Sequence, residues 1–200
     1  MNGRNKTQGY EIMTGISKER FDKKETVFKL QAYASHVFND LANIRNKNKK
    51  ILDGDILCRN SAWNLEYGVY KKETWSVRIC KVKTESKKFF FYPEWKGSDI
   101  PLDREKMIVT GPIPWYNVPL ARPGTAAWDM EARHLGFNKL NQNTMWKYKE
   151  FRVYGLRRPL WVFPSNNRVK YIWDDLVIDF TLPAWSYASI VFDSLLEKLK

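Results

Sequence analysis

The sequence is poor in the residues that build redox, metal and disulfide sites. Among 200 residues it has two cysteines, Cys58 and Cys80, and two histidines, His36 and His134. No CxxC or Cys/His spacing surrounds them, which excludes a disulfide framework and a multi-histidine metal site. We therefore expect two buried free thiols, and neither a metal nor a cofactor.

Signature loops for catalysis and long apolar runs are also missing. No serine lies in a Gly-x-Ser-x-Gly elbow and the ten glycines form no phosphate-binding loop, which disfavours acyl transfer and nucleotide hydrolysis. No run approaches 18 uncharged apolar residues, and residues 1–10 lack the apolar segment of a secretory signal. We expect no membrane contact.

Positive charge is abundant by contrast. Lys and Arg number 34 against 22 Asp and Glu, a formal net charge of +12. Residues 1–50 hold 11 basic and 5 acidic groups, so the first quarter of the chain carries half of the excess. Such a balance indicates either a solvated surface or a partner rich in phosphate.

Apolar periodicity predicts an α+β fold with helices near both ends. Apolar residues recur every three or four positions in 26–44, and shorter helices are expected over 125–134 and 186–199. Alternation predicts six to eight strands in a mostly antiparallel sheet between the helices. The expected strands lie around 63–69, 75–79, 89–92, 107–109, 145–154, 160–163, 169–173 and 176–182.

The predicted organisation is a flexible arm over residues 1–25 and a single α+β domain over 26–200. Residues 111–124 hold four of the nine prolines, which fix φ and remove backbone donors. This segment is therefore predicted to be neither a helix nor a central strand, but a stiff extended arm inside that domain. Its apolar side chains Trp115, Tyr116 and Val118 are candidates for docking on another subunit. The alternative is a loop that packs over its own core.

Basic clusters are candidates for nucleic-acid contact, and the cluster over residues 146–154 also interleaves cations with aromatic residues, which make up 15% of the chain. The candidate contacts are Arg45, Lys47, Lys49, Lys50, Lys81, Lys83, Lys87, Lys88, Lys147, Lys149, Arg152, Arg157 and Arg158. The cations between Arg45 and Lys50 also fit a simpler role, because they follow the helix predicted over 26–44 and cations stabilise the C-terminal end of a helix. The aromatic residues equally fit a core or a subunit interface.

Carboxylates in pairs give a weaker indication of metal-dependent nuclease chemistry. One candidate set is Asp53, Asp55 and Glu66, followed by Lys71 and Lys72. A second set is Asp174, Asp175 and Asp179. Neither has a specific spacing, and polar turns and strand edges explain both.

Three functions remain open. Because no catalytic signature is present, we rank first a non-enzymatic structural subunit of a large nucleic-acid-containing assembly, such as a phage or virus particle connector or ring protein. Its partners would be other subunits, copies of itself and nucleic acid, and its location the virion, or the cytoplasm if cellular. The alternatives are a basic nucleic-acid-binding module and a metal-dependent nuclease.

Overall fold

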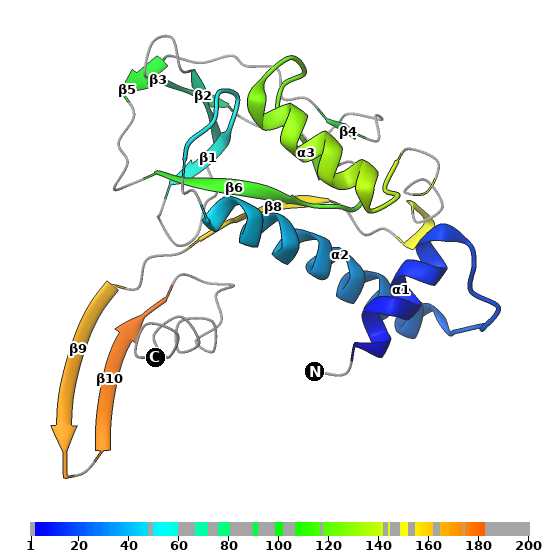
Figure 1. Ribbon diagram of the computed structural model, residues 1–200, viewed down its shortest axis with the longest axis horizontal. Helices are drawn as coiled ribbons and strands as arrows, with labels where there is room; N and C mark the ends of the chain where they lie inside the picture. The colour runs from blue at the N-terminus through cyan, green and yellow to red at the C-terminus, as the bar shows by residue number, and fades with distance from the viewer. Residues whose placement is uncertain are drawn as a thin grey trace.

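The fold is a six-stranded sheet flanked by helices, with a separate hairpin near the C-terminal end (Figure 1). The computed structural model describes residues 3–47, 50–59, 67–71, 76–80, 90–91, 99–101, 107–116, 118–141, 144, 149–151, 155–161, 165–173 and 175–182. The Cys80 side chain and the helix predicted over residues 186–199 lie outside this part of the chain.

Two helices open the described chain, α1 (Arg4–Thr14) and α2 (Lys23–Asn46). The α2 helix begins a turn earlier than predicted, because Asp22 accepts a hydrogen bond from the Glu25 amide at 2.8 Å and caps it. The prediction of a flexible arm over residues 1–25 missed α1. This helix packs on α2 through Tyr10 and Tyr33, whose ring centroids are 5.6 Å apart. A Cβ on Gly9 would collide with the Lys29 carbonyl, so glycine allows this close approach.

The third helix, α3 (Ala126–Phe137), confirms the short helix predicted over 125–134. Thr125 caps it by accepting a hydrogen bond from the Trp128 amide at 3.3 Å. Thr125 also packs against Gly54, where φ is +82° and any side chain would collide with the threonine. Glycine at this turn therefore joins the start of α3 to the start of the sheet.

The main sheet has the order β5-β3-β2-β1-β6-β8, and its neighbouring strands are all antiparallel. Its strands are β1 (Ile56–Arg59), β2 (Tyr67–Lys71), β3 (Ser76–Cys80), β5 (Asp99–Pro101), β6 (Met107–Ile113) and β8 (Leu156–Pro159). The predicted hairpin is confirmed, with Val69 opposite Arg78 in β2 and β3. Figure 1 shows β6 passing between α2 and α3.

Two small sheets complete the fold. Strand β4 (Phe90–Phe91) pairs in parallel with β7 (Val118–Pro119), and β9 (Ser165–Ile172) pairs with β10 (Asp175–Thr181) in an antiparallel hairpin. The α+β class is confirmed, but the strands are divided among three sheets. Where a strand was predicted over 145–154, the described residues form a 3-10 turn, η1 (Lys149–Phe151). Strand β8 likewise lies before, and not within, the predicted strand 160–163.

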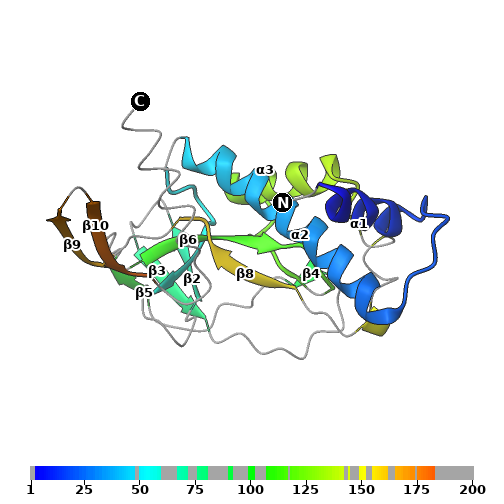
Figure 2. The same cartoon turned by 90° about the horizontal axis from the view of Figure 1, so that it is seen from below.

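The core forms two clusters along α2. The first, named cluster 1, joins the buried side chains Met13, Leu30, Tyr33, Ala34, Val37, Trp115, Val118, Leu120, Leu135 and Leu140. The second, named cluster 2, joins Phe38, Leu41, Leu57, Met107, Val109 and Leu160 beneath the sheet. Figure 2 shows α2 running from α1 to the main sheet, and the helix contributes side chains to both clusters.

The proline-rich segment is not an exposed docking arm. Trp115, Tyr116 and Val118 are at most 6% exposed and pack inside this chain. Pro112 lies within β6, where a central strand was thought to be impossible. The Leu160 amide donates to the Val109 carbonyl, so Pro112, three residues on, falls at a non-hydrogen-bonded position facing β8. On the other side of β6, the pairing with β1 ends at Val109 and does not reach Pro112. The missing N–H of Pro112 therefore costs no hydrogen bond to either neighbouring strand.

Cys58 is a buried free thiol, as predicted, and burial raises its pKa to about 11. Among the described residues, no helix combines the length and the apolar character needed to cross a bilayer.

Candidate nucleic-acid interface

Arg157, a predicted nucleic-acid contact, is instead a fully buried structural cation. Its guanidinium donates to Glu131 Oε1 at 2.6 Å and Oε2 at 3.2 Å. It also donates to Thr110 Oγ1 at 2.8 Å, to the Thr110 carbonyl at 2.6 Å and to the Pro119 carbonyl at 2.9 Å. These five bonds use all five N–H groups of the side chain. Arg157 therefore joins β6, β7, β8 and α3, and is 1% exposed.

Arg45, the first of the predicted contacts in the turn after α2, is buried as well. Its Nη2 donates to Asp55 Oδ2 at 2.6 Å and to the Lys50 carbonyl at 2.9 Å. The Leu52 amide donates to the same carboxylate oxygen at 2.6 Å. Burial raises the pKa of Asp55 to about 6, while the Arg45 charge and these hydrogen bonds oppose that rise. The pair closes the loop between α2 and β1.

These ion pairs also remove support for the nuclease hypothesis. Asp55 is 2% exposed and bound to Arg45, so its carboxylate is not open to a cation. Among the described residues, no group of three His, Cys, Asp or Glu side chains could hold a metal ion. Glu66, Lys72 and Asp174 lie outside the described residues. Asp55 thus serves the fold, and Asp175 and Asp179 of the second set are exposed on the β9–β10 hairpin.

The remaining described candidates are spread along the molecule. Lys47 and Lys50 are exposed beyond the C-terminal end of α2. Lys149 lies 5.9 Å from the Tyr116 ring, in η1, whose Phe151 packs on cluster 1 near α1. Arg158 is half-buried, 4.9 Å from the Phe38 ring. The other predicted contacts, Lys49, Lys81, Lys83, Lys87, Lys88, Lys147 and Arg152, lie outside the described residues.

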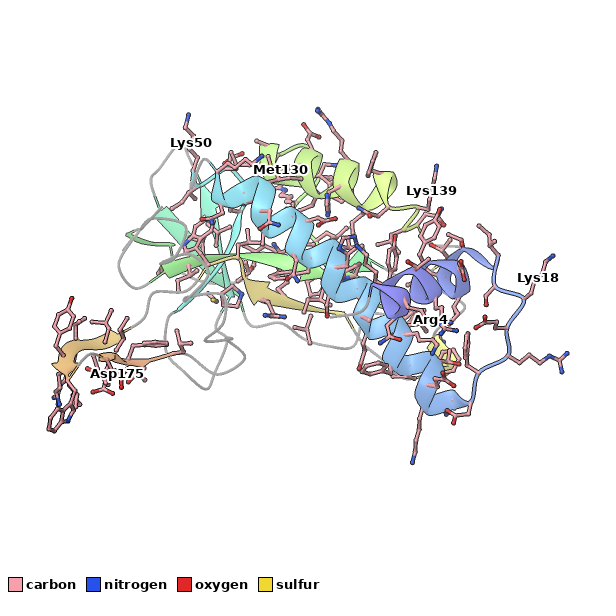
Figure 3. All side chains as sticks on the ribbon, turned by 60° about the horizontal axis from the view of Figure 1, so that its bottom comes forward. Arg4, Lys18, Lys50, Met130, Lys139 and Asp175 are labelled. Carbon is pink, nitrogen blue, oxygen red and sulfur yellow. The ribbon has the colours of Figure 1, made fainter. Side chains whose placement is uncertain are left out.

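A denser group of cations surrounds α1 and the start of α2, and we name it the basic end. It comprises the exposed side chains Arg4, Lys6, Lys18, Arg20, Lys23, Lys24 and Lys139. Figure 3 shows Arg4, Lys18 and Lys139 at the same end of the molecule, with Lys50 at the far end of α2. Within the part of the chain that the structure describes, none of the seven has a carboxylate within ion-pair distance.

Three of the four acidic residues at the basic end have other partners, and the fourth is Glu11 in α1. Glu19 accepts a hydrogen bond from Gln8 at 2.9 Å, and Asp22 caps α2. Glu25 forms an ion pair with the buried Lys29 at 2.5 Å. The seven exposed cations thus form no close ion pair with a described carboxylate, and they outnumber Glu11, Glu19 and Asp22, the carboxylates of this region that are not paired with Lys29. The positive ends of the α1 and α2 dipoles add to this excess of positive charge. Such a surface attracts phosphates through both long-range and contact electrostatics.

No single motif in the sequence indicated the basic end. Six of its seven cations are dispersed between residues 4 and 24, with Lys23 and Lys24 the one adjacent pair, and the seventh is Lys139. The one signal that could have found it was the charge count, since residues 1–50 hold half of the net charge. Folding of α1 onto α2 is what brings these cations together.

Comparison with known proteins gives one informative likeness. No protein-family model and no curated protein matches the chain. The fold is similar to a crystal structure assigned to tRNA pseudouridine synthase D (TruD) from Methanosarcina mazei, with a TM-score of 0.51 and 16% sequence identity. The match covers 86% of this chain and 38% of that chain, so this chain spans well under half of its structural neighbour.

This likeness overturns two interpretations of the sequence. A structural subunit of a phage or virus particle, with a virion location, is contradicted because the fold occurs in an RNA-modifying enzyme. The expectation of a non-enzymatic protein, which rested on missing motifs, is contradicted by the same finding. Connector or ring assembly, with the copies and subunits it would need, has no support in this fold.

Proposed function

We propose that this chain binds RNA as part of an RNA-modifying enzyme, with the basic end contacting the phosphate backbone. The observation that carries the proposal is the group of seven exposed cations, none within ion-pair distance of a described carboxylate, at one end of a fold that resembles a tRNA pseudouridine synthase. Transfer RNA is the first substrate class to test, because that is the substrate named for the structural neighbour.

Binding to an unmodified tRNA transcript is the direct test, measured by fluorescence anisotropy over a series of salt concentrations. The variant Lys18→Gln/Arg20→Gln/Lys24→Gln removes three charges from the basic end. Each phosphate contact contributes about 0.7 to 0.9 to the slope of log affinity against log salt. We expect the slope to fall by roughly 2 if all three side chains contact phosphate.

A matched variant places the same loss of charge at the other end of α2. Lys47→Gln/Lys49→Gln/Lys50→Gln tests the turn that the sequence had favoured, and we expect it to leave the salt slope nearly unchanged. A flattened slope in this variant alone would refute the basic end as the interface. Failure of the unsubstituted chain to bind the transcript would refute RNA binding itself.

The enzymatic half of the proposal has a separate test. Deletion of the gene, followed by nucleoside analysis of the purified tRNA, should show the loss of one uridine modification. Re-expression of the gene should restore it. An unchanged nucleoside profile would contradict a role in tRNA modification, whatever the affinity for RNA.

A further inference from the structure

The β9–β10 hairpin has one apolar face and one charged face. Directly opposed residues of an antiparallel pair point to the same side. The register places Val169 opposite Ile178 and Tyr171 opposite Leu176, and we name these four side chains the apolar face. The other side carries the pairs Arg168 with Asp179, Lys170 with Val177 and Ile172 with Asp175.

The apolar face is open to solvent within the part of the chain that the structure describes. Three of its four side chains are exposed, Val169 at 61%, Tyr171 at 80% and Leu176 at 48%, while Ile178 is half-buried. Trp173 in the turn is 96% exposed. Figure 1 shows the hairpin standing apart from the main sheet. A hairpin of two strands is at best marginally stable in water unless a helix or further strands cover it. This face therefore needs a cover.

The charge of the hairpin disfavours RNA as that cover. Its described charged residues are Arg168, Lys170, Asp175 and Asp179, which sum to zero in a chain of net charge +12. All four lie on or beside the opposite face, and none is among the four apolar side chains. A surface without cations offers nothing to a phosphate backbone, whereas it suits an apolar polypeptide surface.

We propose that residues 186–199 of the same chain cover the apolar face. This stretch lies outside the described residues, and its sequence predicts an amphipathic helix. Its apolar positions are Val191, Phe192, Leu195, Leu196 and Leu199, which share one side at helical spacing. They form the apolar counterpart that the hairpin lacks.

Length and connection favour this segment over any separate molecule. Strand β10 ends at Thr181, so residues 182–185 give a connection of ordinary length for a strand followed by a helix. A helix of 14 residues is about 21 Å long, and strands of seven or eight residues span about 23 to 26 Å. A segment tethered this closely has an effective concentration in the millimolar range, far above that of a free partner.

Cysteine labelling of the full chain tests the proposal. Val169→Cys places a thiol on the apolar face, and Arg168→Cys places one on the charged face of the same strand. The rate of maleimide labelling at each thiol is read by peptide mass spectrometry, which separates it from the native cysteines. We expect Val169→Cys to react at least about tenfold more slowly, the protection given by a modestly stable local structure.

A second pair of variants identifies the cover. Adding Leu195→Asp to Val169→Cys should raise the labelling rate to that of Arg168→Cys, whereas the adjacent Ser194→Asp should leave it slow. If Leu195→Asp prevents folding, the comparison of Val169→Cys with Arg168→Cys, in which residues 186–199 are unchanged, still tests whether the apolar face is covered. Equal rates at Val169→Cys and Arg168→Cys would overturn the proposal. Protection that is lost on hundredfold dilution would also overturn it, because the cover would then be a second copy.

Discussion

Replacement of Glu131 by alanine isolates the most highly connected polar contact of the fold. The substitution removes both carboxylate acceptors of Arg157 and also the acceptor of the Ala121 amide, which donates to Glu131 Oε2 at 2.8 Å. The guanidinium keeps its bonds to Thr110 and Pro119 but remains a buried cation without a counter-charge. Removing one partner of a buried pair costs about 3 to 5 kcal/mol.

Urea unfolding followed by tryptophan fluorescence measures this loss as a change in the free energy of unfolding. For a chain of this size, 3 to 5 kcal/mol corresponds to a fall of roughly 6 to 20 °C in Tm. Asp129→Ala is the matched control, because it removes an exposed carboxylate from the same helix and should change stability by less than about 0.5 kcal/mol.

The double variant Glu131→Leu/Arg157→Met tests whether charge isolation is the cause. It removes the cation together with its partner, so we expect it to lose less stability than the two single changes added together. A loss below about 1 kcal/mol for Glu131→Ala, as for an exposed pair, would refute the reasoning. Strict additivity in the double variant would refute it as well.

Two further predictions concern stability. Trp115→Ala should cost about 3 to 5 kcal/mol in urea unfolding, because the indole is 4% exposed in cluster 1. Unchanged stability, with weaker self-association by light scattering, would favour the docking arm. Because burial raises the pKa of Asp55 from 3.8 to about 6, the folded state holds this proton more tightly. Stability should therefore fall as the pH rises from about 4 to about 7, and an unchanged pH dependence of stability in Asp55→Asn would contradict that origin.

Local patterns predicted the elements whose partners are near in sequence. The repeat of apolar residues through Leu30, Val37 and Leu41 predicted α2, because one side of this helix packs on the core. Alternation predicted the β2–β3 hairpin, whose strands are separated by four residues in the sequence. Both signals arise from periodic burial, which a single chain displays directly.

Contacts between distant residues were beyond such patterns. In the sequence, Arg157 and Arg45 cannot be distinguished from exposed cations. Their burial depends on ion pairs with Glu131 and Asp55, which folding brings close to them. The polar sequence of α1 gave no strong helical pattern, since it buries mainly Met13 and closes on α2 at Gly9. Pro112 was interpreted as a strand breaker because its register in β6 depends on β8, more than 40 residues later.

The contribution of α2 to both hydrophobic clusters has a consequence for how the molecule unfolds. Val37 belongs to cluster 1 and the next residue, Phe38, to cluster 2, so one unbroken helix contributes to both. Melting of the helix at this point would release both clusters at once. The basic end and the main sheet are therefore expected to unfold in a single cooperative transition. In the folded protein, the same continuous helix holds the proposed RNA-binding surface at a constant distance from the main sheet.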